Sequence, residues 1–293
     1  MKPRLHVVVA SLCAVLLVGP ALARADYAAA PDAAVHYYLS LGDSLAAGEQ
    51  PTLPVGQNFG DEGYADQLFA IEQARIPKLR LVKLGCGGES TASMITAVPT
   101  ITVPGIGQVP YEGRGDHFFC SFPHGSQLAD AVAFLQAHRG FVSFVTIDIG
   151  PNDIFQLGSQ AGAAQIAQNL PLILAALRDA AGPGVPIVGM NFYGTRLVDW
   201  FSNPASLPAR ITDVVAFNHF LEGIYGSFGD PVADVESAFS TTVTTPVGGI
   251  PLDVLRICQW TWMCVGPPLG PDVHANAVGY GVIAQAFAKI LNP

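Results

Sequence analysis

Four short segments carry side chains that could together perform acyl transfer. The segments are Gly42-Asp43-Ser44, Gly88-Glu89-Ser90-Thr91, Gly150-Pro151-Asn152-Asp153 and Asp272-Val273-His274. Acyl transfer needs a nucleophile, a base that takes its proton, and hydrogen-bond donors for the oxyanion. A hydroxyl, glycine-rich backbone, a carboxamide and an imidazole supply these roles. Each segment alone has an ordinary explanation as a turn or a helix cap, so the chemistry depends on whether the fold brings them together.

The elements that must position these segments alternate between strand-like and helix-like patterns. Short apolar runs predict five strands, at residues 35–41, 79–84, 141–149, 185–190 and 232–235. Helical periodicity and capping predict helices at 64–76, 126–138, 160–181, 207–228 and 275–291. This alternation predicts an α/β fold, a three-layer α/β/α sandwich around a mainly parallel sheet. Ligands of such sheets bind at the carboxyl ends of the strands, where three of the four segments fall; the fourth lies at the start of the last helix.

The beginning of the chain reads as a secretory signal peptide over residues 1–25. Two basic residues precede an apolar run from Val7 to Val18, and Ala23 and Ala25 form a cleavage pattern of small residues. The run is too short to cross a bilayer comfortably. We therefore expect a secreted, extracellular protein with no membrane span after signal removal. Residues 26–293 are expected to form one domain with insertions at about 97–123 and 240–271, both long for structureless loops.

Charge and cysteine content restrict the classes of function. Removal of residues 1–25 takes away three basic residues and no acid, so the formal net charge changes from −9 to −12. A chain this acidic is a poor candidate for nucleic-acid binding. Four cysteines remain, and in an exported protein an even number indicates disulfides. Of three possible pairings we favour Cys86–Cys120 and Cys258–Cys264, because each closes an irregular stretch rich in Gly and Pro. No histidine pair has metal-ligand spacing, so no metal site is expected.

On these residues the chain resembles the SGNH (GDSL-type) hydrolases, a family of esterases and lipases with a flavodoxin-like five-stranded sheet. The blocks Gly-Asp-Ser-Leu at 42–45, Gly88, Gly-Pro-Asn-Asp at 150–153 and His274 occur in the family's order. The resemblance implies that Ser44 is the nucleophile and His274 the base. It also implies an oxyanion hole made by the N–H groups of Ser44 and Gly88 and the side chain of Asn152, with no cofactor.

The sequence departs from the family pattern at the acid. The usual aspartate lies three residues before the histidine, where this chain has Pro271, and Asp272 lies two residues before it. Either the local turn lets Asp272 reach His274, or a backbone carbonyl near Gly270 or Pro271 orients the imidazole. Both can work, because the third member fixes the tautomer of the histidine and does not accept its proton.

Two other hypotheses compete with this interpretation. Gly88-Glu89-Ser90-Thr91-Ala92 approximates the nucleophile elbow of α/β-hydrolases, in which Ser90 would be the nucleophile, although Ala92 replaces the final glycine. The chain could also be a non-catalytic carbohydrate- or lipid-binding module on the same fold, because fold alone does not establish activity. We interpret Asp43 and Asp153 as structural residues of their turns. The expected partner is a small-molecule or lipid ester, and the expected state is a monomer.

Overall fold

A five-stranded parallel sheet forms the centre of the computed structural model, which describes residues 34–52, 56–58, 60–96, 100–103, 107–110, 120 and 122–293. Its strands are β4 (Leu79–Lys83), β1 (His36–Gly42), β7 (Val142–Asp148), β8 (Ile187–Met190) and β9 (Val232–Ala233), in that spatial order. All neighbouring pairs run parallel. The central strand β7 is almost fully buried, as expected of a parallel strand covered on both faces. The predicted α/β fold with a flavodoxin-like parallel sheet is confirmed.

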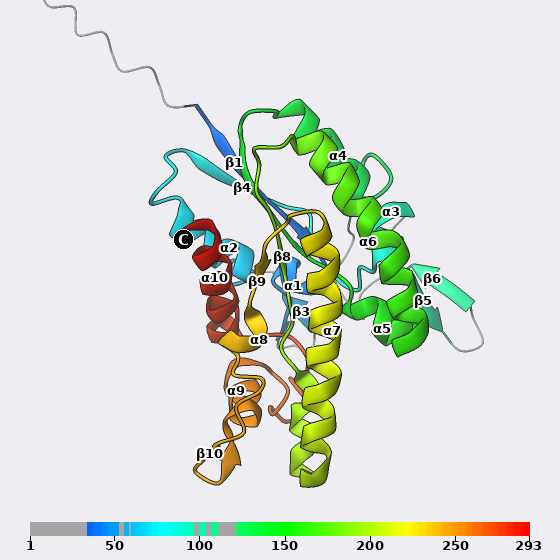
Figure 1. Ribbon diagram of the computed structural model, residues 1–293, viewed down its shortest axis with the longest axis vertical. Helices are drawn as coiled ribbons and strands as arrows, with labels where there is room; N and C mark the ends of the chain where they lie inside the picture. Colours follow the sequence, from blue (N-terminus) through cyan, green and yellow to red (C-terminus); the bar gives the residue numbers. More distant parts are fainter. Residues whose placement is uncertain are drawn as a thin grey trace, which may run out of the picture. The chain divides into compact units, whose positions relative to one another are not determined.

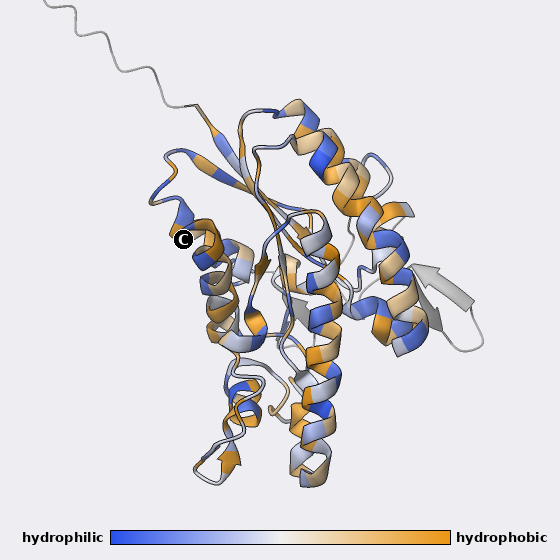
Figure 2. Ribbon diagram, in the orientation of Figure 1, coloured by the Kyte–Doolittle hydropathy of each residue, from blue (hydrophilic) through white to orange (hydrophobic). Residues whose placement is uncertain are grey.

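Helices cover both faces of the sheet (Figure 1). One layer contains α2 (Tyr64–Glu72) and α10 (Ala277–Leu291), which pack against each other. The other contains α4 (Gln127–Ala137), α6 (Ser159–Ala181) and α7 (Leu207–Ser227). Hydrophobic and hydrophilic residues alternate along these helices (Figure 2), as expected of helices with one face on a sheet. None of the helices in the described part of the chain is long and apolar enough to cross a membrane.

Shorter elements surround the carboxyl edge of the sheet. Helices α1 (Ser44–Ala47), α3 (Thr91–Thr96) and α5 (Pro151–Leu157) follow β1, β4 and β7. Three small antiparallel pairs join β2 (Gln50–Thr52) to β3 (Gly56–Asn58), β5 (Thr100–Val103) to β6 (Gly107–Pro110), and β10 (Pro246–Val247) to β11 (Ile250–Pro251). The chain also contains η1 (Thr195–Phe201), η2 (Pro204–Ser206), α8 (Val235–Ala238) and α9 (Leu252–Trp260).

Residues 34–293 form one compact unit. The predicted signal peptide, residues 1–25, lies outside the described residues, as does most of the predicted insertion at 97–123. The predicted insertion at 240–271 contains β10, β11 and α9. Both disulfides, Cys86–Cys120 and Cys258–Cys264, have the pairing favoured from the sequence.

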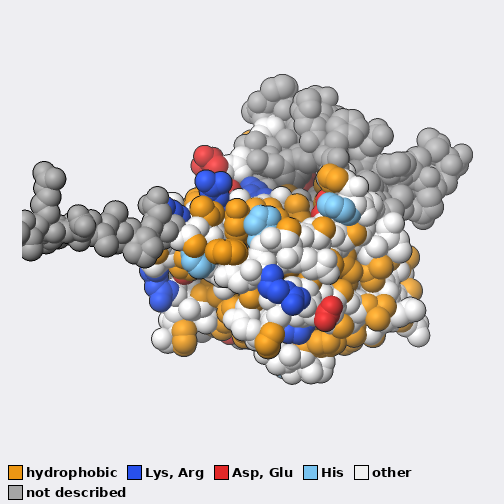
Figure 3. Space-filling view, turned by 90° about the horizontal axis from the view of Figure 1, so that it is seen from above, with side chains coloured by type: hydrophobic (Ala, Val, Ile, Leu, Met, Phe, Trp, Pro, Cys, Tyr) orange, Lys and Arg blue, Asp and Glu red, His pale blue; other side chains and the backbone are white. Residues whose placement is uncertain are grey.

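Charged side chains are sparse on one face of the described protein. On the face drawn in Figure 3, the described lysines and arginines are few and are separated by apolar and uncharged polar side chains. Charged residues make up 13% of the chain. The basic areas that bind nucleic-acid backbones therefore have no counterpart among the described residues of this face.

Candidate active site

Ser44 is the first residue of α1, two residues after the end of strand β1. Asp43 caps this short helix, and its Oδ1 accepts a hydrogen bond of 2.9 Å from the N–H of Leu45. The preceding Gly42 is held by the side chain of Gln127, whose Oε1 accepts from Gly42 N–H at 2.7 Å while its Nε2 donates to Gly42 O at 2.9 Å. Because both polar backbone atoms of Gly42 are bound, the position at which β1 ends and α1 begins is closely defined.

Gly42 must be a glycine for two independent reasons. Its φ of 132° lies in the region that side chains disfavour. A Cβ at this position would lie 2.1 Å from the backbone oxygen of Asp148 on β7. The tight approach of β1 to β7 therefore positions the turn that carries Ser44.

His274 connects Ser44 to Asp272. Its Nε2 lies 2.9 Å from Ser44 Oγ, and its Nδ1 lies 2.7 Å from Asp272 Oδ1. The imidazole is buried. Burial lowers the pKa of His274, but the hydrogen bond that its ring donates to Asp272 and the negative charges of Glu49, Asp272 and Asp43 raise it above its ordinary value overall. This is the relative arrangement of a nucleophile, its base and the group that orients the base.

The shortened spacing between Asp272 and His274 is accommodated by a local turn. Asp272 Oδ1 accepts a hydrogen bond of 2.9 Å from the backbone N–H of His274, two residues later, and the same oxygen faces Nδ1 of the ring. Aspartate commonly binds the backbone two residues on in this way. Of the two arrangements expected from the sequence, the structure has the one in which the Asp272 carboxylate contacts the imidazole.

The segment that carries His274 is held by the end of α9. The N–H of Trp262 donates to His274 O at 3.0 Å, and the N–H of Asp272 donates to Trp262 O at 3.2 Å. The O–H of Tyr193 donates to Val273 O at 2.9 Å. The Cys258–Cys264 disulfide closes the chain on either side of Trp262. Helix α9 is not predicted by the sequence pattern, although the favoured Cys258–Cys264 pairing lies in this stretch.

The three predicted oxyanion donors differ in whether their N–H groups already donate hydrogen bonds. Neither the N–H of Ser44 nor that of Gly88 donates a hydrogen bond to another described residue. Asn152 Nδ2 donates to Glu89 O at 3.0 Å and to Asp43 Oδ2 at 3.3 Å. Both N–H groups of this amide therefore already donate hydrogen bonds. To donate to an oxyanion, Asn152 must give up the longer of the two, the bond to Asp43 Oδ2.

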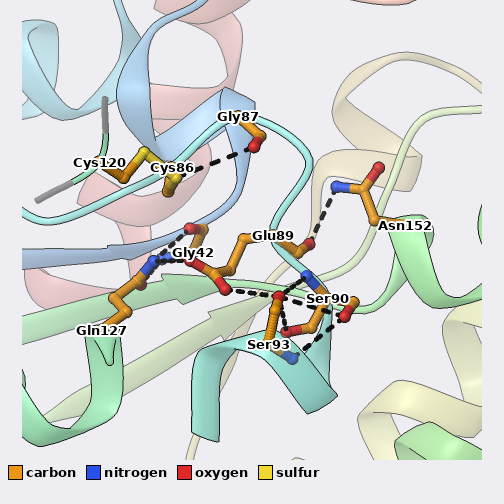
Figure 4. The surroundings of a disulfide bond; sticks show 9 residues. All are labelled: Gly42, Cys86, Gly87, Glu89, Ser90, Ser93, Cys120, Gln127 and Asn152. Atoms are coloured by element: carbon orange, nitrogen blue, oxygen red, sulfur yellow. Dashed lines mark hydrogen bonds between the residues drawn. A yellow bond between two sulfur atoms is a disulfide. The ribbon is translucent and has the colours of Figure 1, made fainter. Parts of the chain in front are cut away.

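Glu89, the residue after Gly88, lies at the centre of a buried hydrogen-bond network (Figure 4). Its carboxyl oxygens accept from the hydroxyl of Ser93 at 2.6 Å and from Nε2 of Gln127 at 2.9 Å. Burial raises the pKa of Glu89 to about 8, although the two hydrogen bonds lower it in part and Asp43 raises it further. Gln127 thus links Glu89 to Gly42, and the network couples the loop of Gly88 to the loop of Ser44. Neither Glu89 nor Gln127 is predicted in this role from the sequence.

Asp43 and Asp148 are two buried acidic residues that lie close together next to Ser44. Burial raises the pKa of Asp148 well above its ordinary value, and the charge of Asp43 raises it further. Burial also raises the pKa of Asp43, which is nevertheless lowered in part by its hydrogen bond with Asp148. The O–H of Tyr64 donates to Asp148 Oδ1 at 2.7 Å. Burial and the neighbouring charge of Asp43 thus favour the protonated form of Asp148. Asp43 itself caps α1, as expected of a structural residue of its turn.

Asp153 and Ser90 are placed away from the imidazole. Asp153 is fully buried and accepts from the N–H of Thr91 at 2.9 Å and from Nε2 of Gln165 at 2.7 Å, so it ties α5 to α3 and α6. The hydroxyl of Ser90 lies 3.2 Å from that of Ser93. The structure therefore brings Ser44, and not Ser90, against His274. Among the described residues, no group of three or more His, Cys, Asp or Glu side chains is placed to hold a metal ion.

A comparison with known protein families gives one match over most of the chain. Residues 40–282 match the GDSL-like Lipase/Acylhydrolase family. A search of curated proteins finds no match.

Solved structures with a similar fold include several esterases. A catalytic mutant of Axe2, an acetylxylan esterase from Geobacillus stearothermophilus, is 17% identical, with a TM-score of 0.50 and coverage of 88% of this chain and 94% of that one. Est24, a carbohydrate acetylesterase from Sinorhizobium meliloti, is 11% identical, with a TM-score of 0.50 and coverage of 87% and 97%. An extracellular lipase from Streptomyces rimosus is 18% identical, with a TM-score of 0.47 and coverage of 87% and 98%. At these identities the likeness to Axe2 and Est24 concerns the fold alone.

Proposed function

The chain belongs to the GDSL-like Lipase/Acylhydrolase family, and on that premise we propose that it is a secreted serine ester hydrolase that forms an acyl-enzyme on Ser44. Family membership supports ester hydrolysis as the activity. The observation that carries the mechanism is the continuous chain of contacts from Ser44 Oγ to His274 Nε2 at 2.9 Å and from His274 Nδ1 to Asp272 Oδ1 at 2.7 Å.

The proposed reaction follows from these contacts. As Ser44 Oγ attacks the ester carbonyl carbon, its proton moves to His274 Nε2, and the carbonyl electron pair moves onto the oxygen. The resulting oxyanion accepts hydrogen bonds from the N–H groups of Ser44 and Gly88 and from the Asn152 amide. His274 then gives its proton to the departing alcohol as the C–O bond breaks. Water attacks the acyl-enzyme by the same route and restores Ser44.

A covalent probe tests the identity of the nucleophile. A serine-directed phosphonate should raise the mass of the protein by one phosphonyl group, and peptide analysis should place that group on Ser44. The Ser44→Ala variant should lose both labelling and ester hydrolysis, whereas Ser90→Ala should keep both. Labelling that persists in Ser44→Ala and disappears in Ser90→Ala would assign the nucleophile to the other serine. A folded protein that neither labels nor hydrolyses any ester would instead be a binding module.

Two further parts of the proposal have their own tests. A chain-length series of nitrophenyl esters, compared with an acetylated xylan, distinguishes a preference for acyl chains from one for acetylated sugars. Secretion is supported by the two disulfides, which suit an oxidising compartment. Intact mass of the exported protein should correspond to a chain that begins after Ala25; an exported or cell-retained protein that still carries residues 1–25 would contradict the predicted cleavage.

A further inference from the structure

Glu49 is brought next to the candidate active site by the same short helix that carries Ser44. Helix α1 is capped at its C-terminus by Gly48, which has a left-handed φ of 81°, and the N–H of Glu49 then donates to Ser44 O at 2.9 Å. A Cβ on Gly48 would lie 2.9 Å from the Cα of Gly63. The O–H of Tyr280 donates to Glu49 O at 2.7 Å. The backbone of Glu49 is therefore fixed from two sides, one turn after the proposed nucleophile.

The Glu49 carboxyl faces the imidazole on the side opposite Asp272. Its Oε2 lies 3.8 Å from His274 Nε2, the atom that also lies 2.9 Å from Ser44 Oγ. Only 3% of the Glu49 side chain is exposed, so water screens this charge weakly. The imidazole consequently has a carboxyl group near each of its nitrogens.

We propose that Glu49 is a second acidic partner of His274, whose carboxylate stabilises the imidazolium that forms when Ser44 attacks the ester. The proposal rests on the proposed function and deepens it. During attack the O–H bond of Ser44 breaks, an N–H bond forms at His274 Nε2, and the ring becomes positively charged. The new N–H points toward Ser44 Oγ and, later, the leaving oxygen, while Glu49 supplies a nearby negative charge without taking the proton. Glu49 is a positioning residue in this sense, because it acts through His274.

The charged groups around the imidazole support this assignment. Those that act on His274 are Asp272 on its own segment, Glu49 after α1 and Asp43 before α1. Tyr193 and Tyr280 stay neutral, because burial raises the pKa of both phenols well above the ordinary value. Burial raises the pKa of Glu49, while His274 lowers it and Asp272 and Asp43 raise it. The acidic neighbours thus favour the charged imidazole over the neutral one.

The Glu49→Gln variant tests the proposal through its pH profile. Loss of the negative charge should lower the pKa of His274, so the acid limb of kcat/KM should move to lower pH by about one unit or more, as expected for a charge at this distance. The high-pH plateau should fall severalfold, because a less basic imidazole accepts the serine proton less readily. The profiles of the variant and the original protein should therefore cross. An acid limb that does not move would overturn the proposal.

Controls separate this charge effect from a loss of structure. Glu62→Gln removes an exposed charge from the neighbouring segment and should leave the limb in place. Glu49→Asp keeps the charge on a shorter side chain and should shift the limb by less than Glu49→Gln. If Glu49→Gln does not fold, Glu49→Ala decides, because it also removes the charge, and an unchanged limb in that variant overturns the proposal.

An NMR titration of the His274 imidazole distinguishes failure of this inference from failure of the proposed function. The titration is done in the Ser44→Ala background, where no turnover is needed. A lower imidazole pKa on adding Glu49→Gln supports the pairing even if no ester is ever hydrolysed. An unchanged imidazole pKa in a protein that does hydrolyse esters overturns the role of Glu49 alone.

Discussion

His274 Nδ1 lies 2.7 Å from Oδ1 of Asp272, although a single residue separates the two in the chain. The same oxygen binds the backbone N–H of His274, so one short turn both shapes the segment and orients the ring. The usual spacing of the family places the acid one residue earlier. In this chain the turn replaces that extra residue.

The Asp272→Asn variant should lose about 10²–10⁴-fold in kcat, because an amide no longer stabilises the tautomer and charge that the mechanism needs. The asparagine oxygen can still accept the backbone N–H of His274, so the turn should persist. Ester hydrolysis and thermal unfolding should be measured on the same preparation. A loss of less than about tenfold in a protein with unchanged stability would mean that another group orients His274.

The Asn152→Ala variant should lose about 10²–10³-fold in kcat, with little change in KM, if the amide serves as an oxyanion donor. Gln156→Ala, on the same helix, provides the matched control, because Gln156 Nε2 donates to Gly88 O at 3.1 Å without a predicted catalytic role. Steady-state kinetics compare the two. Equal, small effects in both variants would show that Asn152 only supports the loop through Glu89 and Asp43.

The buried Glu89 should make stability depend on pH. Its pKa of about 8 in the folded protein lies above the ordinary 4.5, so folding favours the protonated form. Its stabilising contribution is fully present below about pH 4.5 and is lost as the pH rises to about 8, by at most about 1.4 kcal/mol per pH unit. Glu89→Gln should remove this loss, so the variant should gain stability relative to the original protein as the pH rises. Denaturant unfolding at about pH 5 and about pH 9 measures the difference. If the free energies of unfolding of Glu89→Gln and the original protein differ by the same amount at both pH values, the prediction is contradicted.

The two disulfides should contribute unequally to stability and activity. Cys86–Cys120 closes a loop of 34 residues and Cys258–Cys264 a loop of 6. Loop-closure entropy then gives about 4 kcal/mol for the first and about 2 kcal/mol for the second. Paired Cys→Ser variants should show this order in the free energy of unfolding. The smaller loop supports the His274 segment, so the variant without Cys258–Cys264 should lose more activity than its unfolded fraction explains. Activity that falls only in proportion to the folded fraction would contradict this.

The arrangement of the sheet and the first ring of reactive groups could be predicted because local patterns determine them. Ser44, Gly88 and Asn152 follow the ends of parallel strands, which meet at one edge of the sheet. The contributions of Gln127 and Glu49 could not be predicted from the sequence. Gln127 is 85 residues from the Gly42 that it binds, and a glutamine after a helix cap has no pattern that reports such a partner. Glu49 looks like an ordinary residue after a turn, and only the packing of α1 against the His274 segment gives its charge a role.

Helix α9 was not predicted because it is short and surrounded by Gly and Pro. Its backbone contacts with the His274 segment, which lies outside the helix, stabilise it.

The contacts of Trp262 with Asp272 and His274 limit how this protein can be redesigned. In many enzymes a long loop at the rim can be exchanged to change substrate preference, while the catalytic base stays on the scaffold. Here residues 240–271 include the helix and disulfide that hold the base in place. A loop graft that omits the backbone of Trp262 would therefore displace His274 from Ser44. Changes of specificity in this region should be made by side-chain substitution on the existing backbone.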